Sequence, residues 1–209
     1  MNKSIYKVGF WAGLIAFAST VAFFIAQLLQ VLGMISFPWD QVFIFGFSLC
    51  ISIPFLLEIL ALHYLTPLEK KFWSHAVLLF TLIYVVFVIA NYVVQLATVI
   101  PMTLNRTDQS IQLLKQTPHS LFWDFDAIGY IFMGLATLFA IPIFKKQGFE
   151  NWIRYSLISH ALTTPLIAIV YFYPNFSERL LFIGAPWAIT APLFMLVLPI
   201  WFKKQYKIT

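Results

Sequence analysis

The sequence predicts an all-α polytopic membrane protein, a bundle of six transmembrane helices with the N-terminus and the C-terminus both cytoplasmic. Three observations predict it: a composition that is 61% hydrophobic and 10% charged, six long apolar stretches, and an uneven distribution of lysine and arginine. Average soluble domains carry about 25% charged residues, so a soluble globule could not cover its surface with this set. The mean hydropathy of +0.87 therefore excludes an ordinary soluble enzyme, a disordered chain and a nucleic-acid-binding protein.

The apolar stretches are long enough to cross a bilayer. A hydrocarbon core of about 30 Å requires about 20 apolar residues at helical rise. Six stretches meet this requirement, at about 8–31, 41–65, 73–100, 121–144, 153–173 and 181–202, and form one transmembrane domain over residues 1–209. The first stretch exceeds the about 7–15 residues of a signal-peptide core, so we expect it to be a retained helix.

The basic residues set the orientation. An even number of spans places ten of them on the side of the termini, namely Lys3, Lys7, Lys70, Lys71, Lys145, Lys146, Arg154, Lys203, Lys204 and Lys207. The other side holds Arg106, Lys115 and Arg179. Cytoplasmic loops of membrane proteins carry the excess of lysine and arginine. The side of the termini is therefore predicted to be cytoplasmic.

Motifs of metal or catalytic chemistry are missing from the sequence. Cys50 is the single cysteine, and the four histidines (His63, His75, His119 and His160) are dispersed, without metal-binding spacing on one helix. The sequence contains no GxSxG, HExxH, phosphate-loop or dinucleotide motif. We therefore expect no metal, no cofactor and no catalytic residue, and the pattern weighs against an enzyme.

Small residues follow one face of the first stretch. Gly9, Gly13, Ala16 and Thr20 recur at spacings of four, three and four. Helices in lipid associate through close packing of such residues. This face predicts a helix–helix contact within the monomer, and a contact between two copies of the chain is the alternative.

A group of polar side chains shares one depth near the outer ends of the spans. Charged groups at the bilayer centre cost at least about 2.5–3.5 kcal/mol, so such residues mark paired, hydrated or functional sites. The candidate ligand-binding residues are Gln27, Asn91, Gln95, Trp123, Asp124, Asp126 and Tyr130. Carboxylates beside aromatic rings suit an organic cation, or a polar head on an apolar body.

Structural roles are the alternative for several of these residues. Asp124 lies in the first turn of its span, where a carboxylate satisfies free backbone donors and the helix dipole. Asn91 and Gln95 are four residues apart on one face and would serve equally well in interhelical hydrogen bonds.

Two further polar residues lie nearer the inner side. Glu58 and His160 each lie seven residues, or about 10 Å, from the inner end of their spans. If the second and fifth helices are neighbours, the two would form a proton relay or gate. The alternatives are a buried hydrogen bond, or Glu58 reaching to His63 or Lys70.

Three segments carry a resemblance to a known family. They are Asn91–Leu96, Pro118–Trp123 and Gly129–Ala140, with the last the most distinctive. They resemble a family of small six-helix bacterial integral membrane proteins with no known activity. The resemblance implies a prokaryotic cytoplasmic membrane and assigns no residue a role.

The functional prediction is a membrane protein that binds a small amphipathic or cationic molecule in an outward-facing cavity; whether it also transports that molecule is left open. The alternatives are an intramembrane enzyme acting on a lipid or quinone, with the carboxylates as acid and base, and a non-catalytic structural or regulatory subunit. The expected partners are membrane lipids and the small-molecule ligand, with no nucleic acid. The oligomeric state is left open.

Overall fold

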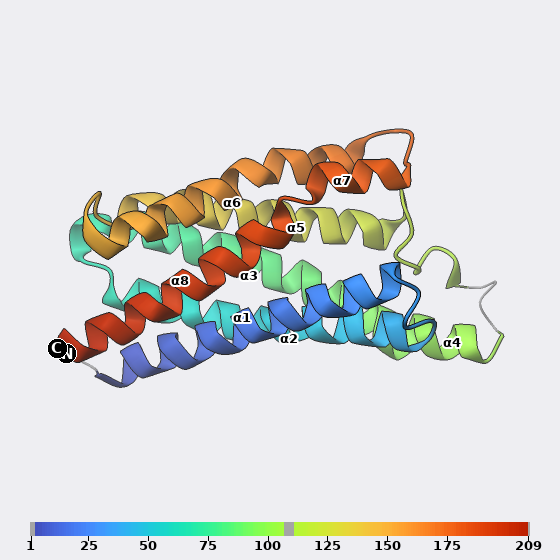
Figure 1. Ribbon diagram of the computed structural model, residues 1–209, viewed down its shortest axis with the longest axis horizontal. Helices are drawn as coiled ribbons and strands as arrows, with labels where there is room; N and C mark the ends of the chain where they lie inside the picture. The colour runs from blue at the N-terminus through green and yellow to red at the C-terminus, as the bar shows by residue number, and fades with distance from the viewer. Residues whose placement is uncertain (1–2, 107–110, 209) are drawn as a thin grey trace.

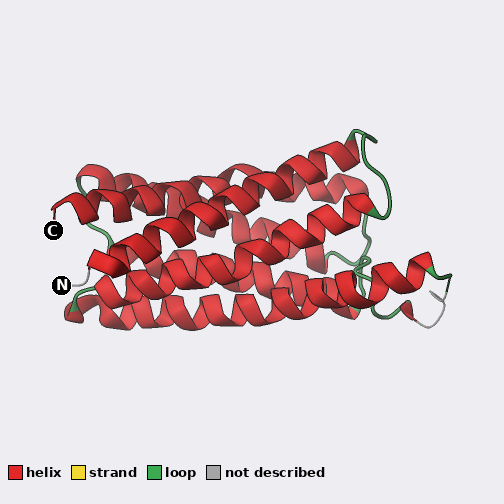
Figure 2. Cartoon of the chain, turned by 90° about the horizontal axis from the view of Figure 1, so that it is seen from below, coloured by secondary structure: helices red, strands yellow, loops and turns green. Residues whose placement is uncertain are grey.

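The protein is a bundle of long helices in the computed structural model, which describes residues 3–106 and 111–208 (Figures 1 and 2). Every regular element within these residues is a helix. The first, second and fifth spans are α1 (Lys3–Val31), α2 (Trp39–Leu65) and α6 (Gly148–Phe172). The third joins η1 (Leu68–Lys70), α3 (Lys71–Val94), η2 (Gln95–Val99) and α4 (Ile100–Leu104); the fourth joins α5 (Leu121–Ala140) and η4 (Ile141–Ile143). The sixth joins η5 (Glu178–Leu180), α7 (Leu181–Gly184) and α8 (Trp187–Ile208).

The outer surface of the six helices is largely apolar. Six helical stretches are long and apolar enough to cross a membrane. Large apolar side chains point outward along them, for example Leu162 at 69% and Ile189 at 73% exposure. Exposure of this much apolar surface to water would be unfavourable and would lead to aggregation. The protein is therefore a multi-pass membrane protein with six spans, as the sequence predicts.

The six spans form a closed ring in chain order. Each helix packs against the next in the order α1, α2, α3, α5, α6 and α8, and α8 packs against α1. Short connections favour this order, because consecutive helices then pack as antiparallel neighbours. The shared core draws on all six spans and includes Phe55, Tyr84, Met133, Leu157 and Phe194.

Small residues allow the closest helix contacts. Gly9, Gly13, Ala16 and Thr20 are all buried, on the predicted face of α1. A methyl group at Gly9 would lie 2.5 Å from the Phe202 ring of α8. Glycine on α1 therefore allows α1 and α8, the first and last helices of the ring, to pack closely against each other.

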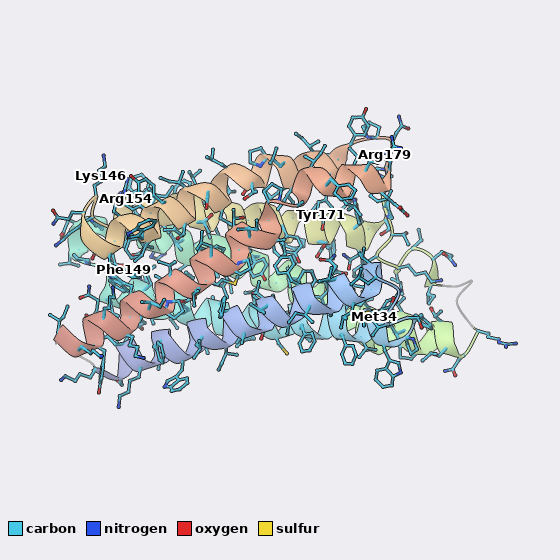
Figure 3. The ribbon with its side chains drawn as sticks, in the orientation of Figure 1. Met34, Lys146, Phe149, Arg154, Tyr171 and Arg179 are labelled. Carbon is cyan, nitrogen blue, oxygen red and sulfur yellow. The ribbon has the colours of Figure 1, made fainter. Side chains whose placement is uncertain are left out.

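Both termini lie at one end of the bundle, here called the termini end (Figure 1). Basic side chains there satisfy carbonyls that the helix ends leave without donors. Arg154 donates to Ile141 O at 2.7 Å, and Lys70 donates to Ile143 O at 2.7 Å. Figure 3 shows Arg154 and Lys146 at this end and Arg179 at the opposite one.

The sixth predicted span, 181–202, contains a break between two helices. It breaks after Gly184, and α8 begins at Trp187. Pro186 lies in this break and has no backbone N–H, so it cannot continue the ladder from the preceding turn. Pro192 and Pro199 follow within α8.

The third span is the longest, at 37 residues, and contains a wide turn. The N–H of Ile100 bonds to Gln95 O, five residues back, so η2 is a π-helix. Pro101 follows directly, and its ring would crowd the carbonyl four residues before it in an α-helix. Figures 1 and 2 both show α4 projecting beyond the other helices at the end opposite the termini.

Candidate functional site

Asp126 of α5 is the centre of a buried hydrogen-bond network. Its side chain is 3% exposed and accepts hydrogen bonds on both oxygens. Tyr92 OH donates to Oδ1 at 2.8 Å, and Asn91 Nδ2 donates to the same oxygen at 3.3 Å. Tyr171 OH and Gln116 Nε2 donate to Oδ2 at 2.5 and 2.9 Å. All four donors are neutral, so hydrogen bonds alone replace the water that the carboxylate would have outside the bundle.

A chain of side-chain amides extends this network to the segment before α5. Asn91 Nδ2 donates to Gln116 Oε1 at 3.0 Å. Gln95 accepts from Gln116 N at 3.2 Å and donates to Leu114 O at 2.8 Å. The π-turn begins at Gln95, which is 1% exposed. The wide turn therefore places an amide where it holds the 114–116 backbone against α3.

Aromatic rings enclose the network on the side of α6 and α8. Tyr130 OH lies 2.9 Å from Tyr92 OH, and the Tyr130 ring meets Trp187 edge-on at 4.9 Å. The Trp123 ring lies 4.5 Å from the Tyr171 ring and donates through Nε1 to Tyr171 O at 3.3 Å. Figure 3 shows Tyr171 in the half of the bundle away from the termini.

A pocket of about 140 Å³ adjoins the amide chain. Its walls come from the start of α2, from η2 and α4, and from the segment before α5. The lining residues are Phe37, Gln41, Phe45, Gln95, Val99, Thr103, Lys115, Gln116 and Thr117. The pocket lies at the end of the bundle opposite the termini end, and we call this end the pocket end. Ligand sites for drug-sized molecules measure about 300–1,000 Å³, whereas a cavity of about 150 Å³ binds benzene. The pocket therefore has room for one ring-sized or short-chain group.

Two predicted ligand residues lie outside both the network and the pocket. Gln27 is exposed on α1, and the neighbouring Gln30 instead donates to Asp40 Oδ2 at 2.8 Å. Asp124 is exposed in the first turn of α5. The cap of that helix is Ser120, whose Oγ accepts from Trp123 N at 3.2 Å. Asp124 therefore lies in the first turn, where its charge interacts favourably with the helix dipole, as the structural alternative proposed. The hydrogen bond that caps the helix is made by Ser120 and not by Asp124.

Glu58 and His160 do not form the predicted pair. Both are fully buried, but α2 packs on α1 and α3 while α6 packs on α5 and α8. His160 Nδ1 lies 3.1 Å from Thr190 Oγ1, and its ring lies 4.6 Å from that of Phe194. Neither Glu58 oxygen has a hydrogen-bond partner in the part of the chain that the structure describes. The condition on which the pair depended, adjacent second and fifth helices, is not met.

The other suggested partners of Glu58 are also engaged elsewhere. His63 Nδ1 lies 3.0 Å from Ser74 Oγ, and Lys70 donates to the Ile143 carbonyl. Glu58 instead faces Gly13 of α1: a methyl group at Gly13 would collide with its carboxyl group and lie 2.7 Å from Pro199 Cγ.

Several residues of the site were not among the predicted ones. Tyr171 lies near the outer end of its span, where tyrosine commonly anchors a helix at the membrane interface. A tyrosine at this position therefore did not indicate a contact with Asp126. Gln116 lies in a connection, and only the fold shows that it turns back into the bundle. The pocket wall at Val99 and Thr103 depends on the π-turn. Pro101, two residues after Val99, was the sequence signal for that distortion.

The fold and the site define a six-span membrane protein with a small polar pocket beside a buried carboxylate network. Within residues 3–106 and 111–208, no group of three or more His, Cys, Asp or Glu side chains gathers where it could hold a metal ion. Comparison of the chain with family models, with curated proteins and with solved structures gives no match.

Proposed function

We propose that this membrane protein binds a small amphipathic molecule, with its polar head in the pocket at the pocket end. The observation that carries the proposal is the position of Gln116. Its side chain lines the pocket and also donates to the buried carboxylate of Asp126. A ligand head in the pocket would therefore contact a group that is held in place by the network.

The lining favours a neutral or anionic head over a cation. Among the described lining residues Lys115 is the charged one, and the polar remainder consists of three glutamines and two threonines. Asp126, the carboxylate that was expected to attract a cation, is saturated by its four neutral donors. Phe37, Phe45 and Val99 supply the apolar wall for the adjoining part of the ligand.

The same geometry favours binding over intramembrane catalysis. A general acid or base must reach the proton that it transfers, directly or through one water. Asp126 is enclosed, and its partners come from α3, α6 and the segment before α5. Transport of the bound molecule extends the proposal and requires the packed core around Phe55 and Phe194 to open, because in this conformation it holds only a cavity of about 10 Å³.

Three probes with the same apolar tail and different heads test the proposal: hexanol, hexanoate and hexylammonium. We expect hexanol and hexanoate to bind the protein in lipid nanodiscs above the level of empty nanodiscs, measured by saturation-transfer NMR. Hexylammonium should bind at least about tenfold more weakly than hexanoate, a difference of about 1.4 kcal/mol. Thr103→Phe, which fills the pocket, should reduce binding of hexanoate to the level of empty nanodiscs.

The matched control is Leu104→Phe, which introduces the same side chain at an exposed neighbour on α4. It should leave hexanoate binding unchanged. Equal binding by the wild type and Thr103→Phe would show that the pocket is not the site, and preference for hexylammonium would restore a cationic ligand. No binding of any probe above the lipid background would favour the structural-subunit alternative.

We further propose that the termini end faces the cytoplasm of a prokaryotic cell, with the pocket end on the outer side of the cytoplasmic membrane. The ten basic residues on the termini side and the family resemblance support this orientation. The test places single cysteines at Lys146 and at Arg179 in a Cys50→Ser background. A membrane-impermeant maleimide added to intact cells should label position 179 and leave position 146 unlabelled; the reverse pattern would invert the orientation.

A further inference from the structure

Glu58 is a buried carboxyl group that the pocket does not use. It is 0% exposed, and both of its oxygens lack hydrogen-bond partners among the described residues. It lies seven residues, or about 10 Å, from the end of α2 at Leu65, and thirteen residues, or about 20 Å, from Phe45 in the pocket wall. A buried carboxylate without a partner carries a large desolvation cost, so its retention calls for a specific reason.

The surroundings of Glu58 make room for the carboxyl group without compensating a charge. Gly13 of α1 has no side chain at the point that the carboxyl group occupies, and Pro199 of α8 closes the same space. The group therefore lies where α1, α2 and α8 meet, at the seam between the first and last helices of the ring. Close packing at this seam leaves no space for a large counter-ion.

The nearest ionisable groups on these helices are occupied by other contacts. On α1, the Lys7 ammonium lies over the Tyr206 ring of α8, and on α8 the Lys203 ammonium lies over the Phe10 ring of α1. On α2 itself, His63 contacts Ser74. On α3, which packs against the other side of α2, the Tyr84 ring meets Phe55 edge-on. A proton is the one cation that can neutralise the carboxylate without additional space.

Hydroxyl groups lead from Glu58 toward the pocket end. Ser52 and Ser48 follow on α2, about 9 and 15 Å away along the helix axis. Both hydroxyls are buried, Ser52 beside the Tyr84 hydroxyl and Ser48 beside the Tyr130 hydroxyl. The Thr81 hydroxyl of α3 is buried without a partner among the described residues. Buried hydroxyls are normally hydrogen-bonded, and the gap of about 9 Å between Glu58 and Ser52 requires more than one bridging water molecule.

We propose that Glu58 is a proton-binding site that exchanges its proton with the pocket end along Ser52 and Ser48. The bound form is the carboxylic acid, which fits the apolar seam. Release leaves the carboxylate and passes the proton to the hydroxyl path. The site is independent of the proposed ligand pocket, and either assignment stands if the other fails.

Infrared difference spectroscopy of the protein in nanodiscs tests the proposal. The carboxylic-acid C=O band of Glu58 is assigned by comparing the wild type with Glu58→Gln, which keeps the shape of the side chain and cannot ionise. We expect a band that is present in acidic buffer, disappears in alkaline buffer and is missing from Glu58→Gln. In D2O, Ser52→Ala should slow the deuterium shift of this band at least about tenfold, since it removes one member of the path. Ser159→Ala, a hydroxyl change on α6, is the matched control and should leave the rate unchanged.

Three results would overturn the proposal. They are the absence of a Glu58 acid band at every pH, a band that persists unchanged in alkaline buffer, and loss of the band at constant pH on adding sodium chloride but not choline chloride. The first shows a permanent carboxylate, the second a fixed acid, and the third a sodium site. An unchanged deuterium rate in Ser52→Ala would overturn the path through Ser52.

Discussion

Asp126→Ala is expected to lower the free energy of unfolding by about 3 kcal/mol or more, because each buried donor left without its acceptor costs about 1–3 kcal/mol. The change leaves hydrogen-bond donors of Asn91, Tyr92, Gln116 and Tyr171 without their acceptor in the interior. It also removes the group that ties α3, α5 and α6 to the segment before α5. The measurement is reversible unfolding in detergent micelles with increasing dodecyl sulfate, followed by circular dichroism.

Asp124→Ala is the matched control, because it removes a carboxyl group two residues away on the same helix. Asp124 is exposed, so its loss should cost no more than about 1 kcal/mol, the value of a first-turn charge at the helix dipole. Asp126→Asn should fall between the two, since its amide oxygen still accepts from one side. If Asp126→Ala is no less stable than Asp124→Ala, the network is not the centre of this half of the bundle.

Gly13→Ala is expected to lower the free energy of unfolding by about 1–3 kcal/mol, the cost of overpacking a close contact. The added methyl group would collide with the Glu58 carboxyl group and lie 2.7 Å from Pro199 Cγ. In an unhindered helix the same change would gain about 1 kcal/mol, because alanine is the better helix former. The same unfolding assay measures it, and the second change Glu58→Ala should recover part of the loss by emptying the space.

Gly46→Ala tests the opposite sign on the neighbouring helix. Nothing lies within 4 Å of a methyl group added at Gly46, so this variant should be equally stable or more stable than the wild type. Equal effects at Gly13 and Gly46 would show that the α1–α2–α8 seam is not tightly packed. Failure of Glu58→Ala to relieve Gly13→Ala would assign the collision to Pro199 alone.

Depth and helix face indicated which polar residues lie together. Asn91, Gln95, Asp126 and Tyr130 were grouped by their distances from the span ends and by their shared faces, and one hydrogen-bond network connects these four in the structure. Gln27 has the same depth but points away from the network. Depth is determined by residue count and helical rise, whereas the direction of a side chain depends on how each helix is rotated in the bundle.

Pairing between helices was the weaker inference. Glu58 and His160 have equal depths, but the ring places their helices apart, with α2 beside α1 and α3 and α6 beside α5 and α8. The pocket was likewise not predictable, because it depends on the π-turn at Gln95 and on the course of residues 114–117. No periodicity of apolar residues encodes either feature.

By itself, the sequence determined that six helices span a membrane, because the composition leaves no soluble alternative and the length of each apolar run matches a bilayer. It also determined which polar residues share a depth, since rise per residue is constant. Only the tertiary structure decided that Asp126 is saturated, while Glu58 has no hydrogen-bond partner within residues 3–106 and 111–208. The physical reason is that lipid offers the helices no hydrophobic preference for one neighbour over another, so contacts such as Gly13 against Glu58 and Gln116 against Asp126 set the arrangement.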